Sequence, residues 1–401
     1  ILQSSSSNGI KTSFAPYPLE EVIPVDTLIY SRLRKVSKIG DFIAKTSGTR
    51  TFPWRIIVAT EDPKVLPSTD LVQKLASPSE IKGDLSWIKP GQITDEWLVN
   101  ANLFNVPFKA GKNTDTYIYY RDFVKEFGLE YIMVDEGWYR NGDLTKLNPD
   151  IDLKKIAAYA QEKGIGLGLW FNATDLDLSL DEMLSYYSKL GVKVVLVDFI
   201  NRNDQKAMNF YEKLAFACAK YQVMLNLHSA PTPAGFEITF PNAITREGVM
   251  GTEWNGWTNF VTPSHNLTIP FTRMASGSLD YEPGLLENSN EESFRNTWGR
   301  PMSLGTRAHQ LAMYVIYDNP LQYFIGNPSQ ARKEPEFMTF LGSMPTTWDE
   351  TIILEGKPGE YIVTARLKDG IWYLGAMTDW TEREFNVDLS PLGITHYDLQ
   401  G

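Results

Sequence analysis

Four short apolar stretches of the sequence each end in side chains that can transfer a proton or bind a hydroxyl group. The stretches and their polar ends are 131–134 with Asp135 and Glu136, 166–171 with Asn172, 194–197 with Asp198, and 223–227 with His228. Cleavage of a glycosidic bond needs two carboxyl groups, because one protonates the leaving oxygen and the other attacks the sugar or activates water. A carboxylate at a strand end can equally cap a helix or form an ion pair, so the pattern alone leaves both roles open.

These stretches and the segments between them indicate how the polar residues are positioned. Continuous apolar runs are typical of strands buried in a parallel sheet. Helices are expected over residues 117–127, 152–163, 181–190 and 203–221, and a glycine follows each of the first three. A doubly wound sheet would divide its functional strand ends around a switch point, whereas here every strand delivers a polar group to the same side. The pattern therefore predicts an α/β fold of the (β/α)8 TIM barrel type.

Changes in this pattern divide the chain into three parts. Residues 1–65 are irregular, with a strand expected over 52–59, and are interpreted as the remnant of an N-terminal β-sandwich domain. Residues 66–330 form the catalytic barrel with its linker. Residues 331–401 alternate strands with turns, which indicates a C-terminal antiparallel β-sandwich domain. The chain opens on isoleucine rather than methionine and stops at Gln400-Gly401 soon after a strand-like stretch, so we expect segments to be missing at both ends.

The composition excludes several classes of function. The chain of 401 residues has a net charge of -11 and no lysine- or arginine-rich run, so nucleic acid is not expected as a partner. No glycine-rich phosphate loop follows a strand, and no apolar run of about twenty residues predicts a membrane span. The 11 Trp, 19 Tyr and 20 Phe residues fit either a large core or a site that stacks sugar rings on aromatic side chains.

Several motifs resemble those of glycoside hydrolase family 97. They are YIMVDEGW at 131–138, VDF at 197–199, NLH at 226–228, FPNAI at 240–244, REGVMGTEW at 246–254, PTTWDET at 345–351 and GEYIVTAR at 359–366. The resemblance runs from about residue 50 to the end of the chain. It implies a large N-terminal β-sandwich, a (β/α)8 barrel and a C-terminal β-sandwich, of which the first part would be mostly missing here.

One position of this resemblance implies a choice of mechanism. Inverting members carry a glutamate base directly after the histidine of the NLH motif, where this chain has Ser229. Retaining members carry an aspartate nucleophile where this chain has Asp198. The resemblance thus implies a retaining exo-glycosidase in which Asp198 attacks the anomeric carbon and Glu253 serves as acid and then as base. Their carboxyl groups are expected about 5–5.5 Å apart.

The substrate that the resemblance implies is a terminal α-galactoside. A β-L-arabinopyranoside has the same ring geometry without the hydroxymethyl arm and stays open as an alternative. An inverting α-glucosidase would need a base that Ser229 cannot supply. A catalytically inactive carbohydrate-binding homologue is a further alternative, against which the presence of both acids argues. Because family members are typically exported, a periplasmic or otherwise exported bacterial protein is expected.

Further residues are candidates to bind the sugar or a metal ion. The candidate sugar-binding residues are Asp135, Glu136, Trp138, Trp170, Asn172, Arg202 and His228. Trp254 and Trp257 are additional candidate platforms, although a core position is the default for any tryptophan. Glu247 and Glu253 resemble the family's ligands for Ca²⁺, a hard cation that prefers oxygen, and Glu247 could instead pair with Arg246. A further calcium ligand of the family belongs to the N-terminal sandwich, so the missing N-terminal portion could be a partner as a separate segment.

Overall fold

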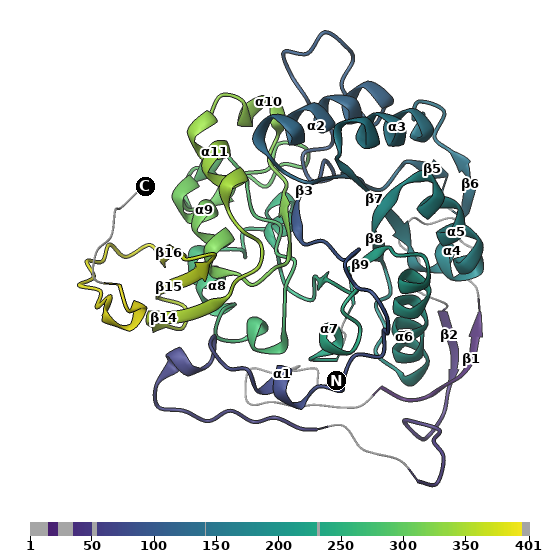
Figure 1. Cartoon of the computed structure of the whole chain (residues 1–401), viewed down its shortest axis with the longest axis horizontal. Coiled ribbons are helices and arrows are strands. Elements are labelled where there is room, and N and C mark those ends of the chain that lie inside the picture. The colour runs from purple at the N-terminus through teal and green to yellow at the C-terminus, as the bar shows by residue number, and fades with distance from the viewer. Residues whose placement is uncertain (1–14, 23–34, 50–53, 141, 231–232, 395–401) are drawn as a thin grey trace.

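The computed structural model describes residues 15–22, 35–49, 54–140, 142–230 and 233–394 (Figure 1). Within them, parallel strands form one sheet in the order β10–β9–β8–β7–β4–β3–β13. These strands are β3 (Gly91–Thr94), β4 (Tyr131–Val134), β7 (Gly166–Asn172), β8 (Val192–Asp198), β9 (Met224–Leu227), β10 (Thr245–Arg246) and β13 (Leu321–Phe324). Neighbours in the sheet follow one another along the chain, as in repeated βαβ units, and the last strand pairs with the first.

An irregular segment, residues 279–283, lies between β10 and β13, and we call it the closing segment. The backbone N–H of Asp280 donates to the carbonyl of Arg246 in β10 at 2.8 Å. On the other side, the N–H of Ile325 donates to the carbonyl of Pro283 at 3.3 Å. The closing segment takes the place of the strand that the seven-stranded sheet lacks, and the predicted TIM barrel is confirmed.

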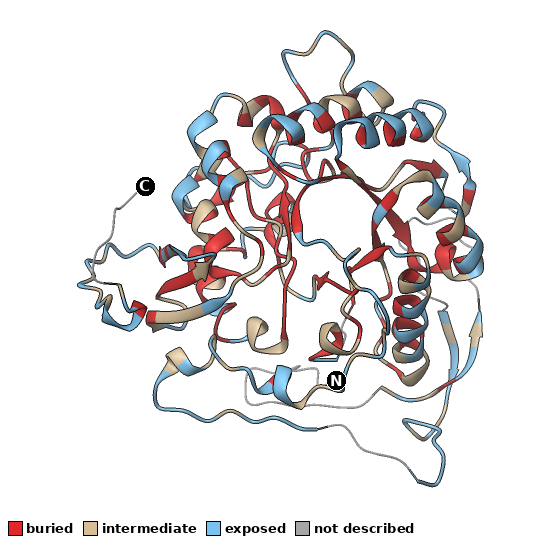
Figure 2. Ribbon diagram, in the orientation of Figure 1, coloured by how far each residue is buried: buried red, intermediate tan, exposed pale blue. Residues whose placement is uncertain are grey.

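Helices lie around the outside of the sheet, with buried faces toward the strands and exposed faces outward (Figure 2). The principal ones are α2 (Thr114–Phe127), α3 (Leu153–Lys163), α4 (Ala173–Leu178), α5 (Leu180–Leu190), α6 (Gln205–Lys220) and α9 (Arg307–Ile316). The side chain of Asn113 caps α2 by accepting from the N–H of Thr116 at 3.0 Å. Gly128, with a φ of 78°, ends that helix in a conformation that a glycine adopts without strain.

Strand β8 shows how an apolar run becomes a barrel strand. It pairs with β7 on one side and with β9 on the other. Residues 194–197 are at most 1% exposed, because both faces of a parallel barrel sheet are covered. Asp198, the last residue of the strand, is only half-buried. The strand therefore holds its one carboxylate at the end of the barrel, where the βα loops begin.

The N-terminal part contributes a pair of antiparallel strands, β1 (Pro18–Val22) and β2 (Lys35–Ile39). They lie beside α6 in Figure 1. Lys45, which follows β2, exchanges two hydrogen bonds of 2.8 Å with the Gln205 side chain at the start of α6. The expected strand over 52–59 is wrong for residues 54–59, which form no strand; residues 52 and 53 lie outside the described part of the chain.

The C-terminal part forms a three-stranded antiparallel sheet of β14 (Glu350–Lys357), β15 (Tyr361–Lys368) and β16 (Ile371–Thr378). It packs on α9, where a Cβ added to Gly375 would lie 2.8 Å from the Cβ of Val315. Helix α11 (Pro335–Ser343) follows residue 330 but belongs spatially to the barrel, since the Leu341 carbonyl accepts from the Gln92 amide of β3 at 2.7 Å. The proposed domain boundaries stay a prediction.

Shorter elements occupy the loops. They are η1 (Pro63–Val65), α1 (Leu71–Leu75), β5 (Tyr139–Arg140), β6 (Asp143–Leu147), α7 (Phe236–Thr239), η2 (Thr252–Gly256), α8 (Pro263–Thr268), η3 (Arg273–Ser276), β11 (Asn288–Ser289), β12 (Ser303–Leu304), α10 (Pro328–Ala331) and η4 (Ser390–Leu392). Across the described ranges, no helix has the length and apolar character needed to cross a lipid bilayer.

Candidate active site

A pocket opens at the C-terminal ends of the barrel strands. Its lining residues are Asp95, Trp97, Leu98, Asp135, Glu136, Trp170, Asp198, Phe199, His228, Glu253, Glu282 and Ile325. They come from the ends of six strands, from the loop after β10 and from the closing segment. Of the residues predicted for the site, Asp135, Glu136, Trp170, Asp198, His228 and Glu253 are brought together here. This end of a barrel is where the fold places active sites.

The backbone after β8 fixes the orientation of Asp198. Its Oδ1 atom accepts from the backbone N–H of Phe199 at 2.5 Å, and the indole Nε1 of Trp170 lies 3.4 Å from Oδ2. Phe199 and Asn201 have φ angles of 58° and 48°, so the chain turns through left-handed conformations directly after the carboxylate. Helix α6 is capped by Asp204, which leaves Asp198 without a capping role.

Glu253 also lines the pocket, from the short helix η2 after β10. Burial, followed by the negative charge of Glu247, raises the pKa of Glu253 well above its usual range, although His228 acts in the other direction. Asp198 and a hydrogen bond between the Glu253 and Glu247 side chains raise it further. A carboxyl group that keeps its proton near neutral pH is what a general acid requires.

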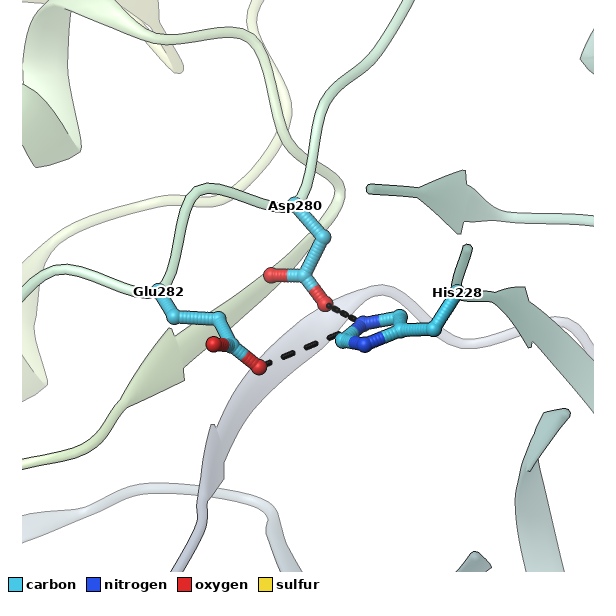
Figure 3. A group of neighbouring side chains, drawn as sticks. All are labelled: His228, Asp280 and Glu282. Atoms are coloured by element: carbon cyan, nitrogen blue, oxygen red, sulfur yellow. Dashed lines mark hydrogen bonds and ion pairs between the residues drawn. The ribbon is translucent and has the colours of Figure 1, made fainter. Parts of the chain in front are cut away.

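His228, which also lines the pocket, forms a charged cluster with Asp280 and Glu282 of the closing segment (Figure 3). Its Nε2 atom lies 3.0 Å from Oδ2 of Asp280 and 3.9 Å from Oε1 of Glu282. Burial lowers the pKa of His228, but the hydrogen bond to Asp280 and the surrounding carboxylates raise it well above its usual range. His228 therefore presents a positive charge to the pocket at neutral pH.

This cluster has the spacing of a metal site as well. Among the described residues, it is the group of three whose possible ligand atoms all lie within 4.8 Å of one another. The Asn226 amide also donates to Oδ2 of Asp280, at 2.7 Å. The ion pair and these hydrogen bonds give the three side chains contacts within the fold. A metal ion would have to displace the proton of His228 before it could use the three as ligands.

A second group of acids follows β3 and β4. Burial raises the pKa of Asp95 to about 6 and that of Glu96 to about 7. Tyr117 donates to Oε1 of Glu96 at 2.6 Å, and the N–H of Asp135 donates to the same oxygen at 3.2 Å. Asp95 and Asp135 line the pocket and can accept hydrogen bonds from hydroxyl groups.

The remaining predicted residues lie outside the lining. Trp138 is fully buried and donates from Nε1 to the carbonyl of Trp170 at 2.7 Å, so it supports that residue from behind. The Asn172 side chain caps α4, accepting from the N–H of Thr174 at 2.9 Å. The structure thus gives both residues contacts within the fold, at the rear of the pocket wall.

Arg202 and Glu247 also lie outside the lining. Arg202 forms ion pairs of 2.8 Å with Asp204 and 2.7 Å with Glu21 of β1. Oε2 of Glu247 accepts from the backbone N–H of Ser229 at 2.8 Å. The alternative partner expected for Glu247, Arg246, pairs with Glu237 instead, at 3.0 Å.

Sequence reasoning missed several residues of the pocket. Asp95 and Trp97 follow β3 as Asp135 and Glu136 follow β4, so the same strand-end pattern could have found them. Glu282 had no such signal, because the closing segment is not a regular strand.

Comparison with known proteins places this architecture in a family. A family model described as Glycoside hydrolase 97 matches residues 96–249, and one described as Glycosyl-hydrolase 97 C-terminal, oligomerisation, matches residues 347–400. A retaining alpha-galactosidase of Bacteroides thetaiotaomicron is 39% identical over 401 residues, covering 98% of this chain and 60% of that protein. A probable retaining alpha-galactosidase of Streptomyces bingchenggensis is 31% identical over 337 residues, covering 82% of this chain and 50% of that protein.

Solved structures agree with these matches. A family 97 enzyme of Pseudoalteromonas sp. strain K8, in complex with acarbose, superposes with a TM-score of 0.70 at 28% identity, covering 81% of this chain and 55% of that one. A beta-arabinopyranosidase superposes with a TM-score of 0.66 at 26% identity, covering 79% of this chain and 50% of that one. The chain spans 60% or less of the length of these relatives. The similar sequences and the similar barrel structures point to the same family, and the chain belongs to glycoside hydrolase family 97.

Proposed function

We propose that the protein is a retaining exo-glycosidase that hydrolyses terminal α-galactosides. One observation carries the choice of mechanism: Asp198 and Glu253 line one pocket, whereas Ser229, after β9, offers no carboxylate. Two relatives with the names retaining and probable retaining alpha-galactosidase support the substrate class. The β-L-arabinopyranosidase alternative is supported by a solved neighbour with the name beta-arabinopyranosidase, which is less similar to this chain than the first of those relatives.

The reaction would proceed in two displacements. In the first, a carboxylate oxygen of Asp198 forms a bond to the anomeric carbon while the bond to the leaving oxygen breaks and Glu253 protonates that oxygen. In the second, Glu253 takes a proton from water, whose oxygen attacks the same carbon and releases Asp198. Two inversions give net retention. His228, Asp95 and Asp135 would hold the sugar hydroxyl groups in the pocket.

The anomeric form of the first product tests this mechanism. Proton NMR during hydrolysis of an α-galactoside should show the α-anomer of galactose before mutarotation. If the β-anomer comes first, the enzyme inverts and Asp198 is not a nucleophile. Azide added to an Asp198→Ala variant should yield the β-galactosyl azide, whereas undiminished activity of that variant would also rule out the role. Comparison of kcat/KM for the α-galactoside with kcat/KM for the matching β-L-arabinopyranoside decides between the two substrates.

We also propose that Glu247 and Glu253 contribute to a Ca²⁺ site. Their carboxyl groups share a hydrogen bond, so oxygen atoms of both lie close enough together for one hard cation to bind them. Ca²⁺ takes six to eight oxygen ligands, so these two residues fit only as part of a site, and water or the proposed N-terminal segment would supply the rest. A bound Ca²⁺ would supply positive charge and orient Glu253. Calorimetric titration of the Glu247→Gln variant with Ca²⁺ should show weaker binding than wild type.

An exported location stays a prediction of the family resemblance.

A further inference from the structure

Three tryptophans cluster at the rim of the pocket, and we call Trp97, Trp257 and Trp298 the rim tryptophans. The ring centroid of Trp97, which lines the pocket, lies 4.2 Å from that of Trp298 and 6.0 Å from that of Trp257. Trp257 and Trp298 remain 38% and 42% exposed. Their planes are inclined by only 30°, with centroids 6.2 Å apart. Trp257 and Trp298 thus keep part of their ring surface exposed to solvent beside Trp97, which lines the pocket.

The rim tryptophans are attached to the segment that carries Glu253. Trp257 directly follows η2, and its N–H continues the turn by donating to the carbonyl of Trp254 at 3.2 Å. A Cβ added to Gly256 would lie 3.4 Å from Cε3 of Trp298, so this tryptophan packs closely on the segment of the acid. The same added atom would lie 3.1 Å from Cδ1 of Leu98, a residue of the pocket lining.

The proposed reaction requires the leaving group to lie near Glu253, on the segment that also carries Trp257. The general acid must lie next to the glycosidic oxygen, and the leaving group extends from that oxygen. A leaving group on the side of Glu253 meets the surface formed by Trp257 and Trp298. A sugar ring has flat C–H faces that pack on aromatic rings, and exposed apolar surface of this kind commonly marks a binding site.

We propose that Trp257 and Trp298 bind the leaving saccharide, so that the enzyme is selective for galactosides whose leaving group is itself a sugar. The inference rests on the proposed function and deepens it. Trp97 links this surface to the pocket, since its Nε1 donates to Oε2 of Glu136 at 3.3 Å while its ring packs on both other tryptophans. The acid and the leaving-group surface are therefore parts of one structural unit.

The test compares two substrates in each variant. An α-1,6-linked galactosyl-glucose and methyl α-galactoside both need protonation of the leaving oxygen, but only the first has a sugar as leaving group. We define the ratio as kcat/KM for the disaccharide divided by kcat/KM for the methyl glycoside. In Trp257→Ala and in Trp298→Ala this ratio should fall by about tenfold, because only the disaccharide loses a transition-state contact. A ratio within one variant is unaffected by its folded fraction, and a displaced acid should slow both substrates, because both leaving groups are alcohols that need protonation. Trp257→Phe should restore most of the ratio.

A control variant and a second measurement separate the possible failures. Trp380, another tryptophan with 45% exposure, lies after β16 in the C-terminal part, and Trp380→Ala should keep the wild-type ratio. Wild-type hydrolysis of both substrates with an unchanged ratio in Trp257→Ala and Trp298→Ala overturns the inference but not the proposed function. If wild type hydrolyses neither, the proposed function fails, and the surface is then judged by tryptophan fluorescence. Titration with glucose should quench the tryptophan fluorescence of wild type but not that of the double variant Trp257→Ala/Trp298→Ala. Equal quenching in both proteins would overturn the inference that this surface binds a sugar.

Discussion

The two sides of the pocket hold their carboxyl groups in different ways. On the β8 side, Asp198 is half-buried and fixed by the Phe199 N–H and the Trp170 indole. On the side of the loop after β10, Glu253 is packed against a second carboxyl group, Glu247, and its pKa is raised by burial and by that neighbour. In the proposed mechanism, this difference in surroundings would assign the two carboxyl groups of one barrel mouth to different roles, with Asp198 as nucleophile and Glu253 as proton donor.

The largest effect is expected on the β8 side. Asp198→Asn should lower kcat/KM by about 10⁴-fold or more, because an amide cannot form the glycosyl ester. The loss should be equally severe for α-galactosyl fluoride and for methyl α-galactoside, since both need the nucleophile. Steady-state kinetics with the two substrates measure it. A variant that retained turnover of the fluoride would contradict the role of Asp198.

The other side of the pocket should respond selectively. Glu253→Gln should lower kcat/KM for methyl α-galactoside by about 10²–10⁴-fold, because the leaving oxygen is no longer protonated. Release of fluoride from α-galactosyl fluoride needs little protonation, so the first displacement should be largely spared and a burst of fluoride is expected. An equal loss of this burst and of methyl glycoside hydrolysis would mean that the two sides do not differ in role.

A similar contrast between two buried histidines predicts a pH dependence. His228 is surrounded by carboxylates, whereas His309 contacts the Asn266 amide at 3.2 Å and burial lowers its pKa to about 4. Between about pH 6.5 and pH 4, His309 is protonated in the unfolded chain but not in the folded protein. The free energy of unfolding therefore falls as the pH falls, by about 3 kcal/mol in total. Chemical denaturation of wild type and His309→Gln at several pH values should show a shallower loss in the variant, and parallel curves would contradict this.

The smallest effect concerns the attachment of the β8 side to the N-terminal strands. Glu21 of β1 pairs with Arg202 at 2.7 Å and with Lys206 at 2.8 Å, which ties the loop after Asp198 to that segment. Glu21→Gln should lower the free energy of unfolding by about 1 kcal/mol, since the pair is only partly shielded from solvent. Glu20→Gln is the matched control, because Glu20 pairs with Lys38 on the surface. Equal denaturation midpoints for the two variants would show that the tie contributes nothing.

Much of the fold could be predicted because β4, β7 and β8 are continuous apolar runs with a polar end. The closing segment could not, since residues 279–283 form isolated backbone bonds and no regular strand. The site divides in the same way. Asp198 lies in the pocket because it ends a strand, whereas Arg202 follows a left-handed turn at Asn201 that no apolar pattern records, and it pairs with Glu21.

The closing segment has a further consequence for heat inactivation. It is joined to its neighbours by isolated backbone bonds, so fewer backbone bonds must break there than between the paired strands β7 and β8. Because it carries Asp280 and Glu282, its opening would separate them from His228 while the other strands stay paired. Activity should then be lost on heating before the barrel melts, and amide exchange should be faster along this seam than along strands β7 and β8.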